Sequence, residues 1–288
     1  MLPRMTSRTS WWGRISLWQR FLLLLVLAGV AAAILFFLRQ SPDPETAIFR
    51  IAASGDGEAT FVVEGNDPTW SPDGNSVLLT QDDEEGVSQI YRFELGGSEP
   101  TLITTGGNPS WSPDGSMIAF SLDDDQGVAS IYTIDVGGGE PTLLTVGDKP
   151  AWSPDGAMIA FSSEDEGGNA GVSTFDLASS EVTLLTRGDE PSWAPDGSSI
   201  VFVSENADGD SEIQIFNVAS SDVSFVAGGD DPVWSPDGTT IAFSGEDLND
   251  EPTVFTVVPG SAPVQVTSGE EPSWSPDGSE FVFVRAAE

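Results

Sequence analysis

The chain has 288 residues, enough for one large domain or two small ones, and carries 46 acidic against 10 basic residues. Residues 1–50 hold six of the basic residues and two acids, so the remaining 238 residues have four bases and 44 acids, a net charge of −40. Such a surface repels phosphate backbones and excludes direct nucleic-acid binding. The sequence has no His and no Cys, which excludes Ser-His-Asp and Cys-His catalysis, disulfides and zinc-thiolate sites.

Residues 21–38 form an uninterrupted apolar segment without a charge. A helix of this length, rising about 1.5 Å per residue, nearly spans a bilayer core of about 30 Å. Four arginines and no acid precede the segment, whereas Arg39, Asp43 and Glu45 follow it, an asymmetry that places the N-terminus in the cytoplasm. We therefore expect a basic cytoplasmic tail over 1–20, a single-pass membrane helix over 21–38, a linker over 39–46 and an extracytoplasmic domain over 47–288.

A cleaved signal peptide is the alternative for this segment, since Ala31-Ala32-Ala33 resembles a peptidase site. Cleavage there would leave the apolar residues 34–38 at the new terminus, and the apolar region of a signal peptide is usually shorter. These two features favour the uncleaved anchor.

The motif Pro-x-Trp-(Ser/Ala)-Pro-Asp-Gly occurs six times, and its tryptophans are spaced by 41, 41, 41, 41 and 40 residues. A period of about 40–45 residues with four short strands per unit is typical of a β-propeller. In one repeat, residues 108–111, 117–122, 130–136 and 141–146 show the apolar, β-branched and aromatic composition of strands. Gly, Pro, Asp and Ser fill the segments between them.

The ends of the chain predict how the ring closes. Only one strand, 280–285, follows the last motif, and two strands, 48–53 and 60–65, precede the first. Pairing these three in one blade removes exposed sheet edges. The predicted fold is therefore all-β, a six-bladed propeller closed by its N- and C-terminal strands and preceded by one transmembrane helix.

The repeated WSPDG segments, followed by strands such as IAF and IYTID, resemble the TolB family of six-bladed propellers. The same repeats occur in the propeller domains of prolyl-oligopeptidase-type peptidases. The resemblance covers about residues 46–288 and implies that the Trp strand is the innermost strand of each blade. The chain differs from periplasmic TolB by its predicted anchor and by the lack of a separate N-terminal α/β domain, and from the peptidases by the lack of a hydrolase domain.

The tryptophans and turn aspartates of the motif have a structural interpretation, because every copy contains both. Each Trp is expected to pack between neighbouring blades, and each Asp to cap a tight turn. These residues are Trp70, Asp73, Trp111, Asp114, Trp152, Asp155, Trp193, Asp196, Trp234, Asp237, Trp274 and Asp277.

The two positions before the first Pro of each motif vary in identity but not in place. If the Trp strand is innermost, as the resemblance implies, these positions surround one mouth of the central channel. Their acidic members are Asp67, Asp148, Asp189, Glu190, Asp230, Asp231, Glu270 and Glu271, and Lys149 is the one base. One interpretation is a solvated acidic rim; the other is a focused negative field that captures a divalent cation or a basic peptide.

The segment Asn206, Asp208, Asp210 and Glu212 alternates oxygen ligands like a calcium loop, although a charged hairpin turn explains it equally. No catalytic residue and no cofactor other than calcium is expected. The sequence favours a membrane-anchored, non-catalytic scaffold that binds a protein partner, with a basic segment as its contact. A small-ligand or cation sensor and a carboxylate-dependent glycosidase are the alternatives.

Overall fold

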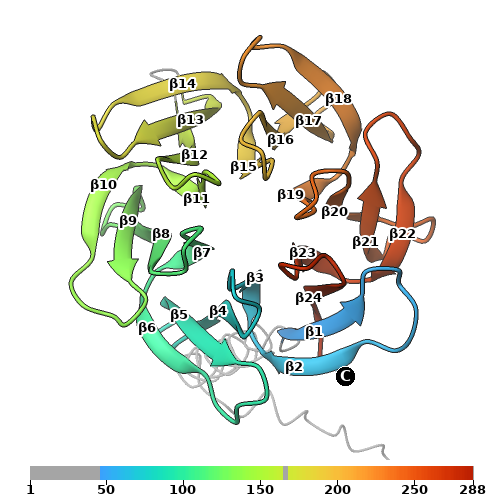
Figure 1. Cartoon of the computed structure of the whole chain (residues 1–288), viewed down its shortest axis with the longest axis horizontal. Helices are drawn as coiled ribbons and strands as arrows, with labels where there is room; N and C mark the ends of the chain where they lie inside the picture. The colour runs from blue at the N-terminus through green and yellow to red at the C-terminus, as the bar shows by residue number, and fades with distance from the viewer. Residues whose placement is uncertain (1–45, 165–167, 288) are drawn as a thin grey trace, which may run out of the picture. The chain divides into compact units, whose positions relative to one another are not determined.

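The computed structural model describes residues 46–164 and 168–287, which form twenty-four strands in six four-stranded antiparallel sheets. The sheets are arranged as blades around a central axis (Figure 1). This confirms the predicted all-β, six-bladed propeller. The predicted tail 1–20, the membrane segment 21–38 and residues 39–45 of the linker lie outside the described residues. Within the part of the chain that is described, no helix is long and apolar enough to cross a membrane.

Five blades consist of four consecutive strands, from the innermost to the outermost. Blade 1 holds β3 (Asn66–Trp70), β4 (Ser76–Asp82), β5 (Ser88–Glu94) and β6 (Thr101–Thr105); blade 2 holds β7 (Gly107–Trp111), β8 (Met117–Asp123), β9 (Ala129–Asp135) and β10 (Thr142–Val146). Blade 3 holds β11 (Asp148–Trp152), β12 (Met158–Glu164), β13 (Ala170–Asp176) and β14 (Val182–Arg187). Blade 4 holds β15 (Asp189–Trp193), β16 (Ser199–Glu205), β17 (Ser211–Asn217) and β18 (Val223–Gly228); blade 5 holds β19 (Asp230–Trp234), β20 (Ile241–Glu246), β21 (Pro252–Val257) and β22 (Val264–Ser268).

The sixth blade joins the two ends of the described chain. It contains β23 (Glu270–Trp274) and β24 (Glu280–Ala286) from the C-terminal side and β1 (Thr46–Ala52) and β2 (Thr60–Glu64) from the N-terminal side, in the order β2-β1-β24-β23. The register of β1 on β24 is continuous from Thr46–Ala286 to Ala52–Glu280. The predicted closure is confirmed, with β1 starting two residues earlier than expected.

The second strand of each blade is buried on both faces, because neighbouring blades cover its sheet from both sides. In β8, Ile118, Ala119 and Phe120 have no exposed surface. The motif tryptophan of the same blade, Trp111, packs with Leu78 of blade 1 in one apolar cluster, and its indole Nε1 donates to the carbonyl of the preceding blade at Thr69 (3.3 Å). Trp274 makes the same hydrogen bond to the carbonyl of Val233 (3.4 Å), whereas the buried Nε1 atoms of Trp70, Trp152, Trp193 and Trp234 have no hydrogen-bond partner among the described residues. Apolar burial is therefore the contact that the motif tryptophans share.

The Ser-Pro-Asp-Gly turn after each Trp is closed by the side chains of its own residues. Ser112 Oγ donates to Asp114 Oδ1 (2.7 Å) and accepts from the N–H of Met117 (2.9 Å), while the N–H of Gly115 donates to the Ser112 carbonyl (2.9 Å). Hydrogen bonds from Ser116 and Ser112 lower the pKa of Asp114 to about 2. Blade 4 departs from this pattern, because Ala194 stands where the other five turns have serine.

Ala194→Ser should stabilise the protein by about 1 kcal/mol, because the new hydroxyl acquires the two hydrogen bonds that the other turns make. Ala194 is buried, as are its serine counterparts. In a domain of this size the gain corresponds to an increase of roughly 2–4 °C in melting temperature. The reverse substitution, Ser153→Ala, should cost a similar amount in the same thermal unfolding experiment. A lower melting temperature for Ala194→Ser would contradict this assignment of the turn.

Candidate functional site: the channel mouth

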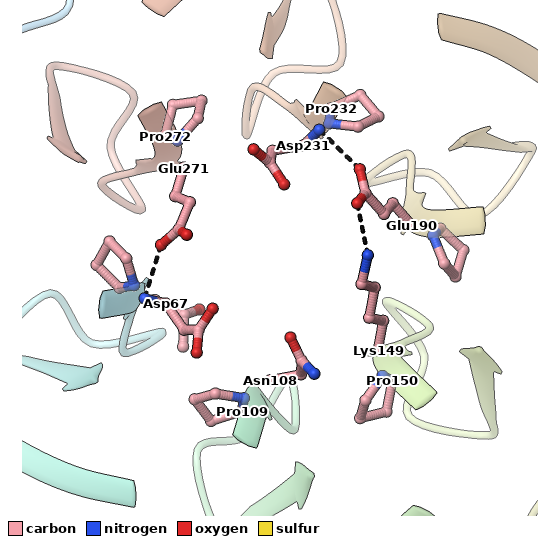
Figure 2. Close-up of a pocket in the computed structure, with 13 residues that line it drawn as sticks. Asp67, Asn108, Pro109, Lys149, Pro150, Glu190, Asp231, Pro232, Glu271 and Pro272 are labelled. Carbon is pink, nitrogen blue, oxygen red and sulfur yellow. Dashed lines mark hydrogen bonds and ion pairs between the residues drawn. The ribbon is translucent and has the colours of Figure 1, made fainter. Parts of the chain in front are cut away.

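A cavity of about 210 Å³ lies where the innermost strands of all six blades begin. Each blade contributes the residue before the first Pro of its motif, and that Pro, to the wall (Figure 2). The lining pairs are Asp67-Pro68, Asn108-Pro109, Lys149-Pro150, Glu190-Pro191, Asp231-Pro232 and Glu271-Pro272. We call this cavity and its six pairs the channel mouth.

All six residues before proline adopt the left-handed backbone conformation, with φ between 48° at Asp67 and 54° at Glu190. Non-glycine residues rarely occupy this region, and its sixfold repetition shows that the blade geometry imposes it. The glycine before these positions is equally constrained: at Gly106, φ is 142° and an added Cβ would lie 2.5 Å from the Phe120 ring. The repeated backbone turns one side chain from every blade into the channel.

Neighbouring blades contact one another through these side chains. The carboxylate of Glu271 accepts the backbone N–H of Asp67 (2.8 Å), and that of Glu190 accepts the backbone N–H of Asp231 (2.8 Å). Lys149 Nζ lies 2.5 Å from the other oxygen of Glu190. Burial by itself would lower the pKa of Lys149, but the hydrogen bond to Glu190 and its charge raise the value overall, so Lys149 is positively charged.

Only half of the eight predicted mouth acids line the cavity. Asp67, Glu190, Asp231 and Glu271 do so, whereas Asp148, Asp189, Asp230 and Glu270 lie one residue earlier and are not in the wall. These earlier residues pair in register with the second strand of their own blade, as Asp230 does with Ser244 and Glu270 with Val284. Their side chains lie outside the cavity wall. Asp148 accepts a hydrogen bond from Asn108 Nδ2 (3.0 Å), and Asp230 and Glu270 are exposed.

Sequence reasoning missed the six prolines of the wall and the special backbone of the residues before them. A residue that precedes proline normally favours extended conformations, so nothing local in the sequence predicts a positive φ there. The repeated Gly-x-x-Pro spacing is the available signal, because each glycine precedes the unusual residue by two positions.

The acids of the mouth differ in how firmly they hold a proton. Burial, followed by the charge of Glu190, raises the pKa of Asp231 to about 6. Burial, followed by the charge of Asp67, raises the pKa of Glu271 to about 8. Burial also raises the pKa of Asp67, although a hydrogen bond from Thr80 Oγ1 (2.7 Å) offsets part of the shift. Desolvation and like charges therefore both act against full ionisation of the mouth.

The calcium hypothesis stays a prediction. Among the residues that the structure describes, no group of three or more acidic side chains is placed to hold a metal ion. In the segment proposed as a calcium loop, Asn206 Oδ1 accepts the backbone N–H groups of Asp208 (2.9 Å) and Asp210 (3.0 Å). This oxygen thus caps the hairpin between β16 and β17.

Acidic hairpins surround the mouth. The first residue of β3, Asn66, pairs with Thr80 near the end of β4, so the β4–β5 hairpin lies on the same side of the propeller as the mouth. The equivalent hairpins of five blades carry Asp82–Glu85, Asp123–Asp125, Glu164, Glu205, Asp208, Asp210, Glu246, Asp247, Asp250 and Glu251. The face around the cavity therefore has a strong negative field.

Comparisons with known proteins find a matching family and solved structures with a similar fold. The family model of the TolB beta propeller domain matches residues 40–211 and 148–288. A putative TolB from Agrobacterium tumefaciens is similar with a TM-score of 0.73 and 26% identity, covering 85% of this chain and 99% of that one. TolB from Acinetobacter baumannii has a TM-score of 0.64 and 19% identity, with 89% and 68% covered.

An oligogalacturonate lyase in complex with manganese shares the fold, with a TM-score of 0.56 and 14% identity over 85% of this chain and 92% of that one. None of the curated proteins compared by sequence matches the chain.

Glu271→Gln should remove a pH dependence of stability. A carboxyl group whose pKa is higher in the folded than in the unfolded chain stabilises the fold fully below its unfolded pKa and loses this contribution as the pH rises through the folded value. For Glu271 that window extends from 4.5 to about 8. We expect the parent's melting temperature to fall by several degrees from about pH 6 to about pH 8.5, and the fall to be much smaller in Glu271→Gln.

The matched control is Glu270→Gln, which removes an exposed charge one residue earlier. It should keep most of the parent's slope, with the fall displaced slightly to lower pH because the charge of Glu270 contributes to the raised pKa of Glu271. The chain has no His or Cys to titrate in the same range. Equal slopes in Glu271→Gln and the parent would show that Glu271 is ionised throughout.

Proposed function

This chain belongs to the TolB beta propeller family, as its repeats predicted, and from that premise we propose that it is a non-catalytic scaffold that binds a protein partner at the channel mouth. A closed ring of blades is rigid and presents loops from several repeats on one face, which suits it to protein recognition. The partner contributes a basic segment that enters the mouth.

The observation that carries this proposal is the imbalance of charge at the mouth. Four carboxyl groups and one ammonium group line the cavity, and the ammonium group of Lys149 is already paired with Glu190. Within the described propeller, the other three acids, Asp67, Asp231 and Glu271, have no cationic partner within 4 Å. A lysine or arginine side chain from a partner supplies the missing charge, and the acidic hairpins attract it from a distance.

The same composition supports a non-catalytic role. The described propeller has Arg50, Arg92, Lys149, Arg187 and Arg285 as its basic residues, and these lie in different blades or strands. A glycosidase needs one acid–nucleophile or acid–base pair at a defined separation, and the mouth acids form a ring rather than such a pair. We therefore propose no catalytic activity for the channel mouth.

Binding should depend on the acids inside the cavity and not on those beside it. The double variant Asp231→Asn, Glu271→Gln should weaken binding of an acetylated, amidated pentalysine peptide at least about tenfold at low salt. The control Asp230→Asn, Glu270→Gln removes two carboxyl groups from the same two blades at exposed positions, and its binding should weaken much less. Isothermal titration calorimetry of the full chain measures both affinities.

Membrane proteins that copurify with the tagged full chain should be retained by the control and lost from the cavity variant. If the two double variants bind the peptide equally well, the acids are a general negative field and the mouth is not the binding site.

We further propose that residues 21–38 anchor the propeller outside the membrane. Protease added to intact cells should then digest the propeller while a tag placed before Arg4 stays protected. The arginine asymmetry around the segment is the reason for this orientation. A mature protein that begins near Ile34 would instead establish a cleaved signal peptide, and a digested tag would reverse the orientation.

A further inference from the structure

The side chains at the mouth are not distributed evenly around the ring. In spatial order, Glu190 of blade 4, Asp231 of blade 5, Glu271 of blade 6 and Asp67 of blade 1 are neighbours, as Figure 2 shows. We call these four residues the acidic arc. Its two ends meet Lys149 of blade 3 and Asn108 of blade 2, so the arc has a cation at one end and a neutral amide at the other.

The contacts along the acidic arc also differ. Glu190 is bound from both sides, by the Lys149 ammonium group and by the backbone N–H of Asp231. At the next boundary, between blades 5 and 6, the carboxyl groups of Asp231 and Glu271 face each other. Neither Lys149 nor Asn108, which carry the N–H donors among the six residues before proline, lies between them. At this boundary, as at the one between blades 6 and 1 where Glu271 meets Asp67, two acids meet without a cation.

Glu271 is surrounded by groups of its own sign. Asp67 on β3, Asp231 on β19 and Glu270 on its own strand all disfavour its ionised form. Its favourable contacts are the Asp67 N–H, which donates to its carboxyl group, and the Ser244 hydroxyl on β20, which accepts its backbone N–H (2.9 Å). On the opposite side of the cavity Lys149 pairs with Glu190 of the neighbouring blade, which leaves the Glu271 carboxyl group without a counter-charge.

We propose that the boundary between blades 5 and 6 couples binding to protonation: Glu271 keeps a proton in the free propeller and releases it to solvent when a basic group of a partner enters beside Asp231 and Asp67. The inference rests on the proposed function and adds a regulation to it. The ammonium or guanidinium group replaces the proton as the neutralising charge. One proton is released to solvent for each basic group that binds at this boundary. The carboxyl oxygen of Glu271 that accepts the Asp67 N–H keeps that hydrogen bond.

The coupling makes the affinity depend on pH in a range where few other groups titrate. The raised pKa of Glu271, about 8, puts the change on the mildly alkaline side of neutrality. Lysine in the probe stays charged there, and the chain lacks His and Cys. A pH dependence in this range therefore reports on the mouth.

The test is calorimetric titration of the full chain with the acetylated, amidated pentalysine peptide. From about pH 6.5 to about pH 8.5 the parent's affinity should rise roughly twentyfold, because binding that releases a proton strengthens as the free proton concentration falls. Titrations near pH 7 in buffers of different ionisation enthalpy should show release of close to one proton. Glu271→Gln should bind with an affinity that changes much less with pH and with little proton release near pH 7, because the pKa of Asp231, about 6, lies below this range.

Two controls separate this inference from the function on which it rests. Glu270→Gln should bind somewhat more weakly than the parent, with most of the parent's rise between the two pH values and a midpoint slightly lower than the parent's, because the charge of Glu270 is the smallest of the three that act on Glu271. The Asp67 amide resonance should titrate with a midpoint near pH 8 in the parent and not in Glu271→Gln, since its N–H donates to this carboxyl group.

Binding that is strong but independent of pH would overturn the coupling and leave the receptor role intact. A failure of the parent to bind the peptide at either pH would overturn both, whatever the amide resonance does.

Discussion

The pairing of β1 with β24 is the constraint on which the rest of the molecule depends. Strands from the two ends of the described chain meet in a continuous register from Thr46–Ala286 to Ala52–Glu280. Without this pairing blade 6 would lack its two outer strands, and the central strand β24 would become an edge. With it, six sheets form a closed ring, and the first residues of six innermost strands are forced to face one another around the axis.

Closure explains how a repeated backbone produces a site that is not symmetric. Every blade delivers its residue before proline to the mouth through the same left-handed turn, so the positions are equivalent. The identities are not: one is Asn108, one is Lys149 and four are acids. The scaffold therefore fixes where the side chains lie, and the differences among repeats decide which boundary between blades has a compensating charge and which does not.

The repeats allowed the blade count, the strand order and the closure to be predicted, because the periodic turns mark the strand ends directly. The mouth was predictable only in part. The sequence places Asp230 and Asp231 side by side before proline, but it does not show that Asp231 lines the cavity while Asp230 pairs in register with Ser244. That difference comes from the positive φ at Asp231, which residues before proline normally avoid. The unequal pKa values of the mouth acids could not be predicted from the sequence either, because they depend on burial and on contacts between blades.

The position of β1 also has a mechanical consequence. β1 lies between β2 and β24, and Thr46 and Ala286 pair at the same end of the blade. Tension applied at Thr46 along the strand, against a hold elsewhere on the ring, loads all the residue pairs of β1 together in shear. Tension that separates Thr46 from Ala286 instead peels the same pairs apart one after another, because the hydrogen bonds of an antiparallel pair run across the strands. The closing blade therefore resists tension applied at Thr46 along the strand better than tension that separates Thr46 from Ala286.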